Sequence, residues 1–220
     1  MHNHGYKTAN RHFKLFTFAL RLKKFSIVPD AFKLDRPQAD LIISSPMIHP
    51  FFNNFLEGTF EHNTIEIANH QYKCCFKISS VEILPDIELS TTEHFTLLTP
   101  MVLSIQKDRE VLPAYYLRPM DILEANRILQ TNLCRKYFLV NNKEYTGSGI
   151  SFKWDEQYLQ SHKRVTKKIT IEKDKPIEVV GVQAPFVIAG DPDLIRIGYE
   201  CGFGEKNSMG FGMALKSNAK

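Results

Sequence analysis

The chain has 220 residues, enough for one large domain or two small ones, and 43% of them are hydrophobic and 24% charged. This composition is typical of a globular protein and excludes an intrinsically disordered one. Twenty-eight Lys and Arg residues face 24 acidic residues, so the net charge of +4 excludes a histone-like polycation. The sequence lacks an apolar run long enough for a membrane span and the apolar core of a secretory signal, which predicts a cytoplasmic protein.

The first half of the chain predicts the order strand, strand, helix, strand. Alternating apolar residues indicate a strand or hairpin arm over Phe13–Val28, and Ala39–Ser45 is a second short strand. Pro46 opens a predicted helix over Met47–Leu56, and Tyr72–Leu84 is a long strand candidate. The polar stretch that follows, residues 86–94, is the predicted domain boundary.

The second half predicts the order strand, helix, strand, strand, helix, strand, with one additional strand. Pro100 indicates an edge or a bulge in the first of these strands. The predicted elements are a strand over Phe95–Ile105, a helix over Pro119–Leu133, strands near Ile150–Trp154, Val165–Ile171 and Ile177–Ile188, a helix over Pro192–Tyr199 and a strand over Gly212–Lys216.

This order is that of the split βαβ or ferredoxin-like fold, and the first half follows it without an opening strand and helix. We therefore expect an α+β protein of two tandem ferredoxin-like domains, residues 1–92 and 93–220. The first domain is expected to lack its opening strand and helix, so that the chain begins inside that domain.

Positive charge and cysteine are unevenly placed along the chain. Residues 1–29 contain six Lys and Arg residues and no acidic residue. A second basic cluster, near a predicted strand of the second half, contains Lys163, Arg164, Lys167 and Lys168. One basic run is usually a solvated surface, but two runs interleaved with strand residues favour a polyanionic partner.

The four cysteines include no CxxC pair, so reduced thiols are expected and a cysteine-based metal site is not.

The most informative stretch is the glycine-rich segment, Cys201 to Gly212. Four of the chain's 11 glycines fall within it, in the pattern GxGxxxxxGxG. Glycine permits positive φ angles and lets a phosphate approach the backbone amides. The pattern is neither a dinucleotide fingerprint nor a P-loop, because Asn207 replaces the third glycine and no Gly-Lys-Ser/Thr follows. A helix-to-strand turn that needs glycines sterically is the competing interpretation.

The segment IGYECGFGEKNSMGFGMALK resembles the C-terminal signature of the CRISPR-associated endoribonucleases of the RAMP superfamily, which cut CRISPR precursor RNA. Near the N-terminus, His-x-x-Gly-Tyr followed by Phe-Lys-Leu-Phe-Thr-Phe resembles the catalytic-histidine segment of that family, and the strand containing Thr99-Pro100-Met101 is also similar. The resemblance implies two RAMP domains, CRISPR repeat RNA as the partner, and a role in antiviral defence. It implies no cofactor, no bound metal and no membrane, a CRISPR effector complex as a further partner, and a monomer or homodimer.

The family's chemistry implies attack of a ribose 2′-hydroxyl on the adjacent phosphate, which leaves a 2′,3′-cyclic phosphate and a 5′-hydroxyl. This reaction needs a proton acceptor, a proton donor and a cation near the phosphate. The family pattern places the catalytic histidine at His2, with His4 as an immediate rival, and a basic residue at Lys14. A terminal tail without function is the alternative for both histidines, and an exposed strand lysine is the alternative for Lys14.

The residues assigned to RNA contact come from the second basic cluster and the glycine-rich segment. They are Lys163, Arg164, Lys167, Lys168, Gly202, Gly204, Lys206, Asn207, Ser208, Gly210 and Gly212. Trp154 is interpreted either as a stacking ring or as a core residue. Two alternatives to a nuclease stay open: a non-catalytic RAMP subunit that binds RNA, and an enzyme that holds a phosphorylated small molecule with the glycine-rich segment.

Overall fold

The structure is a computed structural model that describes residues 6–8, 11–28, 31–46, 63–68, 72–105, 115–171 and 177–217. The chain divides into two compact units. The C-terminal unit consists of residues 89–220 together with residues 1–19 and 43–46, and the second unit consists of residues 20–42 and 47–88. The domain boundary at residues 92 and 93 stays a prediction, and so does the helix over Met47–Leu56, which lies outside the described residues.

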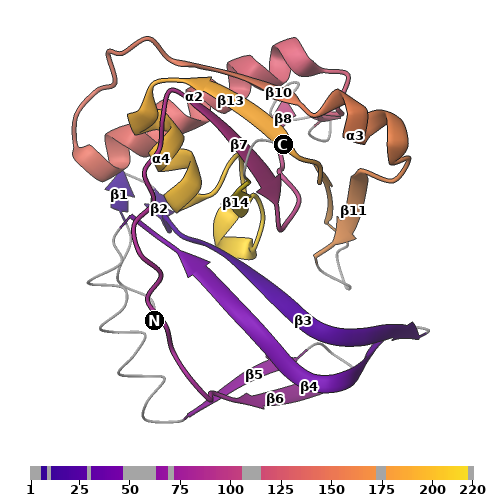
Figure 1. Ribbon diagram of the computed structural model, residues 1–220. Helices are drawn as coiled ribbons and strands as arrows, with labels where there is room; N and C mark the ends of the chain where they lie inside the picture. The colour runs from indigo at the N-terminus through magenta and orange to yellow at the C-terminus, as the bar shows by residue number, and fades with distance from the viewer. Residues whose placement is uncertain are drawn as a thin grey trace. The chain divides into compact units, whose positions relative to one another are not determined.

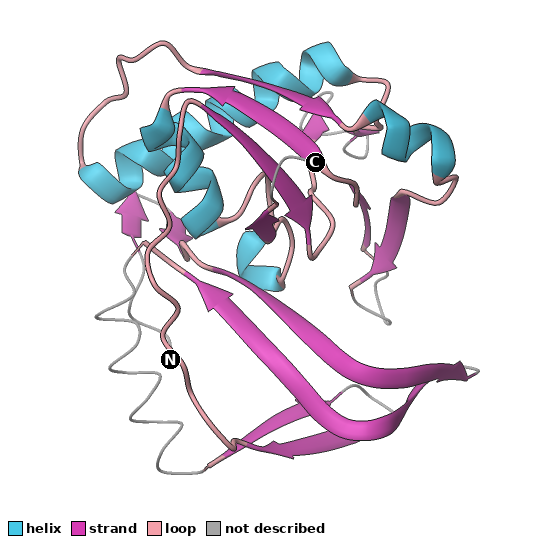
Figure 2. Ribbon diagram, viewed as in Figure 1, coloured by secondary structure: helices cyan, strands magenta, loops and turns pink. Residues whose placement is uncertain are grey.

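The C-terminal unit is built on one four-stranded antiparallel sheet with the strand order β10-β13-β7-β14 (Figures 1 and 2). Its elements follow the chain order βαββαβ, and this strand order is the one expected for a ferredoxin-like domain. The elements are β7 (Thr92–Leu97), α2 (Ile122–Asn141), β10 (Ile150–Trp154), β13 (Phe186–Gly190), α4 (Pro192–Cys201) and β14 (Ala214–Lys216). The predicted fold class is confirmed.

The core of this unit lies between one face of the sheet and the helices α2 and α4. In β7 and β10 every second residue is buried, as expected for strands with one face covered. Phe95, Phe152 and Phe186 lie on that face and belong to the same core cluster as Leu129 and Leu133 of α2. Trp154 is also buried in this core, so the core interpretation of that residue is the correct one.

Several predicted boundaries in this unit are wrong. The strand expected over Phe95–Ile105 is divided at Pro100, and the strand expected over Ile177–Ile188 is divided just before Pro185, because proline has no N–H to donate to a ladder. The additional elements are β8 (Ser104–Ile105), β9 (Tyr115–Tyr116), α3 (Glu156–Ser161), β11 (Thr166–Thr170), β12 (Glu178–Val182) and the 3₁₀ turn η1 (Asn207–Met209), with β8 paired to β9 and β11 to β12.

The remaining strands form two-stranded sheets. The pairs are β1 (Tyr6–Thr8) with β2 (Arg11–Phe13), β3 (Thr17–Val28) with β4 (Ala31–Ser44), and β5 (Thr64–Ala68) with β6 (Lys73–Lys77). The strand predicted over Tyr72–Leu84 is shorter, because its partner β5 begins at Thr64, directly opposite Lys77. Among the described residues, no helix is long and apolar enough to cross a membrane.

Candidate functional site

The glycine-rich segment is a packed loop that joins α4 to β14. Phe203 anchors it in the core, where its ring is fully buried. The centroid of the Phe203 ring lies 5.1 Å from that of Phe95 and 5.0 Å from that of Phe186. The loop backbone reaches this position with positive φ angles at Gly202 and Gly204, which only glycine adopts readily. The loop is therefore held by the sheet itself.

Lys136 of α2, which sequence reasoning missed, holds the loop from inside the protein. Its side chain is 7% exposed, and its Nζ donates to the carbonyl oxygens of Gly202 (2.6 Å) and Gly204 (2.7 Å) and to Oδ1 of Asn207 (2.7 Å). Burial lowers the pKa of the Lys136 ammonium to about 8. One buried cation thus fixes three oxygens of the loop.

The Asn207 side chain is used entirely within the protein. Its Oδ1 accepts from Lys136, and its Nδ2 donates to the carbonyl oxygens of Phe211 (2.9 Å) and Phe203 (3.3 Å). The residue is 7% exposed. The Asn207 side chain therefore offers little surface for the predicted contact with RNA. Its hydrogen bonds instead hold the shape of the loop.

Three amides of the loop are used within the protein and are not available to a phosphate. The N–H groups of Phe203, Glu205 and Gly212 donate to the carbonyl oxygens of Gly212, Val102 and Pro100, respectively. Gly202, Gly204 and Gly212 are buried with positive φ angles, as the steric interpretation expects, and their contact with RNA stays a prediction. This arrangement argues against the small-molecule enzyme. Lys206, Ser208 and Gly210 are the predicted loop residues that keep partial exposure.

The segment that follows Lys14 lies against this loop, although the two are far apart in the sequence. Thr17 is fully buried, and its Oγ1 donates to the carbonyl oxygen of Phe211 over 3.1 Å. Phe18 lies beside Gly210, where an added Cβ would be 3.0 Å from its ring. Lys14 is exposed at the start of this segment. The structure thus joins two of the predicted regions, whereas His2 and His4 lie outside the described residues.

The second basic cluster is divided by the structure. The side chains of Lys163, Arg164 and Lys167 line one cavity between α3, β7 and β11. Lys168, the next residue of β11, instead forms an ion pair with Glu178 of β12. Three of the four predicted cations therefore share one surface.

The Cys201 thiol gives the C-terminal unit a measurable pH dependence. Burial raises the pKa of this thiol from 9.0 to about 12. Between these values the unfolded chain loses the thiol proton and the folded chain keeps it, so the contribution of this thiol to the free energy of unfolding falls as pH rises above 9. We expect the wild type to lose about 1 kcal/mol relative to Cys201→Ala between pH 7 and pH 10, measured by urea unfolding. A difference between the two proteins that does not change with pH would contradict this assignment.

Comparison with known proteins places these features in a family. A family model described as CRISPR associated protein Cas6, C-terminal, matches residues 84–215. A CRISPR-associated endoribonuclease Cas6 of Methanocaldococcus jannaschii is 31% identical over 216 residues, covering 94% of this chain and 76% of the relative.

Two solved structures share the fold. A CRISPR associated protein Cas6 is 30% identical, with a TM-score of 0.75 over 94% of this chain and 80% of its own. The product of a Cas6-related gene from Pyrococcus furiosus is 21% identical, with a TM-score of 0.79 over 94% of this chain and 79% of its own.

Proposed function

The chain belongs to the Cas6 family of CRISPR-associated proteins, and on that premise we propose that it is an endoribonuclease that processes CRISPR precursor RNA within its repeats. The observation that carries this proposal is the contact between the Lys14 segment and the glycine-rich loop. It unites the two sequence regions that resemble the family's catalytic and RNA-binding segments, through the Thr17 to Phe211 hydrogen bond.

The proposed reaction is an internal transesterification. The ribose 2′-oxygen attacks the adjacent phosphorus, the bond from phosphorus to the 5′-oxygen breaks, and the products carry a 2′,3′-cyclic phosphate and a 5′-hydroxyl. His2 or His4 accepts the 2′-hydroxyl proton, because the ordinary pKa of histidine is near neutrality. The leaving 5′-oxygen takes up a proton from water and departs as the 5′-hydroxyl. Lys14, exposed at the start of the segment fixed by Thr17, supplies positive charge to the phosphate in the transition state. No metal ion is needed for these steps.

RNA contact is proposed for the exposed cations and for the partly exposed loop residues. Lys163, Arg164 and Lys167 contribute phosphate contacts from their common surface, and Lys206, Ser208 and Gly210 contribute the surface of the loop. The buried Lys136 and Asn207 act on RNA only by holding that loop in shape. Association with a CRISPR effector complex, and a monomeric or homodimeric state, stay predictions.

Replacement of both His2 and His4 by alanine is expected to reduce cleavage of a labelled CRISPR repeat RNA by at least about 100-fold and to leave RNA affinity unchanged. Positioned proton transfer contributes roughly 10²–10⁴-fold to a rate. The reaction is run in EDTA, and the product ends are identified chemically. His94→Ala is the matched control, because His94 is exposed on β7, outside the glycine-rich loop. It should cleave like the wild type.

Three outcomes would count against this function. Wild-type rates in the double variant would remove the histidine assignment, and a strict Mg²⁺ requirement would remove the proposed mechanism. Tight binding of the repeat without cleavage would favour the alternative, a non-catalytic RNA-binding RAMP subunit.

A further inference from the structure

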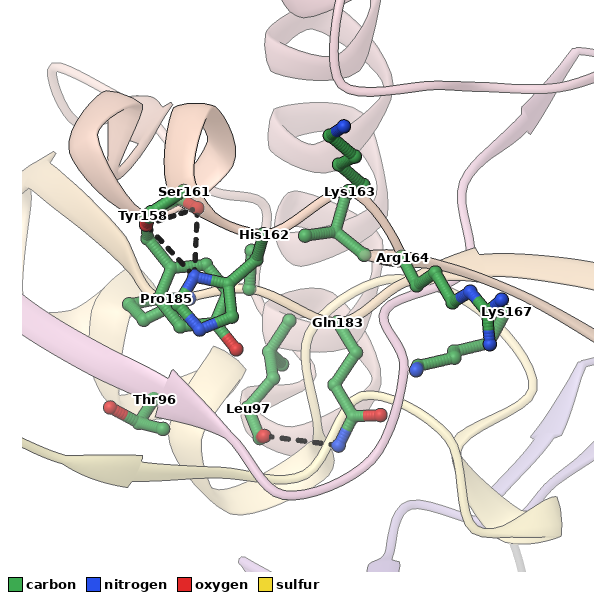
Figure 3. A pocket seen from close by; sticks show the side chains of 12 residues that line it. Thr96, Leu97, Tyr158, Ser161, His162, Lys163, Arg164, Lys167, Gln183 and Pro185 are labelled. Carbon is green, nitrogen blue, oxygen red and sulfur yellow. Dashed lines mark hydrogen bonds between the residues drawn. The ribbon is translucent and has the colours of Figure 1, made fainter.

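A cavity of about 680 Å³ lies beside α3 in the C-terminal unit, outside the glycine-rich loop (Figure 3). Its walls come from the end of β7, the last turn of α3, the start of β11 and the segment before β13. The lining residues are Thr96, Leu97, Tyr158, Ser161, His162, Lys163, Arg164, Val165, Lys167, Gln183, Ala184 and Pro185. Its volume is in the range of pockets that hold small ligands, of roughly 300–1,000 Å³.

Two stacked rings form one wall of the cavity. Tyr158 lies on α3 and His162 is the C-cap of that helix, with ring centroids 3.9 Å apart and ring planes inclined by 6° (Figure 3). Nδ1 of His162 is 3.1 Å from the carbonyl oxygen of Tyr158 and 2.9 Å from Oγ of Ser161. A carbonyl only accepts, so Nδ1 carries the proton in that contact, and the ring orientation is fixed. Because Tyr158 covers one face of the imidazole, a planar ligand would stack on the opposite face.

The charge on the cavity is positive. Lys163, Arg164 and Lys167 are exposed, and the twelve lining residues contain no carboxylate. Within the part of the chain that the structure describes, none of these three cations forms an ion pair, in contrast to Lys168. Cations without acidic neighbours attract polyanions most effectively, since no internal carboxylate competes for them.

Acceptors for the edge of a base are also present. Nε2 of Gln183 donates to the carbonyl oxygen of Leu98 (3.0 Å), which orients the amide, and Figure 3 shows its oxygen directed away from Leu97. With Nδ1 protonated, Nε2 of a neutral His162 is a second acceptor. Exocyclic amines of nucleobases are donors of the kind that these groups accept.

The solvent-facing side of the sheet offers no such stacking surface. Domains of this kind often stack RNA bases on aromatic residues of the open sheet face. Here that face presents Thr92, His94, Thr96, Ser151, Lys153, Val187 and Ala189, and among these described residues there is no phenylalanine, tyrosine or tryptophan. The open face of the sheet therefore gives no aromatic stacking surface, whereas Tyr158 and His162 give one beside α3.

We propose that the cavity is a subsite for one unpaired nucleotide of the bound RNA, whose base stacks on His162 and whose phosphates face Lys163, Arg164 and Lys167. This inference rests on the proposed RNA-processing function and adds the position and chemistry of one contact. It also gives a role to a histidine that has no place in the proposed cleavage reaction.

The test scans single abasic nucleotides through the repeat RNA and measures the affinity of each RNA for the wild type and His162→Ala. A 2′-deoxy nucleotide blocks the mapped cleavage position. For the wild type, one abasic position is expected to lower affinity by roughly 5- to 100-fold, the usual effect of losing one stacked base. His162→Ala should bind intact RNA more weakly than the wild type by a similar factor. An abasic nucleotide at that position should not weaken the binding of His162→Ala any further.

Two further variants separate stacking from charge. His94→Ala is the matched histidine control. Any change in affinity that it causes should be the same for intact RNA and for every abasic RNA. Lys167→Ala should weaken all of the RNAs about equally and reduce the salt dependence of binding by about one phosphate contact.

Each outcome decides between the hypotheses. The subsite would be overturned if the affinity losses of His162→Ala and of the abasic nucleotide were additive at every position. In that case, cleavage of the repeat RNA by the wild type would leave the proposed function intact. Coupling at one position without cleavage would support the subsite and contradict the nuclease. An absence of RNA binding would contradict both. Unchanged thermal unfolding of His162→Ala confirms that the variant is folded.

Discussion

Replacement of Lys136 by methionine is expected to lower the free energy of unfolding of the C-terminal unit by about 3 kcal/mol. The substitution removes the donor to three buried oxygens, those of Gly202, Gly204 and the Asn207 side chain. Each acceptor left without a partner costs about 1–3 kcal/mol, and the loss is partly offset because a buried charge no longer needs to be desolvated. Methionine is unbranched and only one atom shorter than lysine, so little of the effect comes from a cavity.

Trp154 provides the measurement, because it is the single tryptophan of the chain and it is buried in this unit. Its fluorescence during urea unfolding therefore reports on the C-terminal unit alone. Lys143→Met is the matched control, since Lys143 is exposed just beyond α2 and should change the free energy of unfolding by less than about 0.5 kcal/mol. Equal stability of the two variants would remove the proposed role of Lys136 in the loop.

Replacement of Gly212 by alanine is expected to have the largest effect among glycine substitutions in the loop, about 3–5 kcal/mol. A Cβ on Gly212 would lie 1.9 Å from the carbonyl oxygen of Phe203 and 2.8 Å from Nδ2 of Asn207, at a φ of +72°. The Phe203 N–H donates to the carbonyl oxygen of Gly212, so the two backbone segments have no room to separate without breaking that bond.

Gly210→Ala is the control for backbone conformation. Gly210 has a φ of +85°, but the nearest atoms to an added Cβ there belong to the Phe18 ring, at 3.0 Å, and not to the backbone. This variant should lose only the roughly 1–2 kcal/mol that a left-handed conformation costs a residue with a Cβ. The difference between the two variants, followed by Trp154 fluorescence, isolates the backbone clash. If Gly210→Ala were as unstable as Gly212→Ala, the positive φ angle alone would account for the loss of stability, and the proposed backbone clash would be wrong.

The sheet of the C-terminal unit could be predicted because its strands have one buried face. The alternation of apolar residues predicted the exact bounds of β10. Patterns of this kind also gave the βαββαβ order. Asp191 and Pro192 mark the start of α4, where the Asp191 side chain accepts from the Asp193 N–H. These signals are local, so a single sequence contains them.

The internal role of the loop could not be predicted, because it depends on contacts between residues far apart in the chain. Lys136 lies on the apolar face of α2, three residues after Leu133. The predicted helix ended at Leu133, and a lysine beyond a helix end is expected to be exposed to solvent. Asn207 in a glycine-rich stretch suggests a ligand contact until its partners on α2 are known. The short helix α3 has only six residues and buries none of them, so it leaves no periodic signal.

The hydrogen bond from Thr17 to Phe211 joins residues 194 positions apart. Because a chain leaves the ribosome from its N-terminus, the Lys14 segment is synthesised before the glycine-rich loop on which it docks. Closing so long a stretch of chain delays this contact relative to pairs that are closer in sequence, such as β10 with β13. The region proposed to cut RNA therefore depends on a contact that cannot form before the glycine-rich loop has been synthesised.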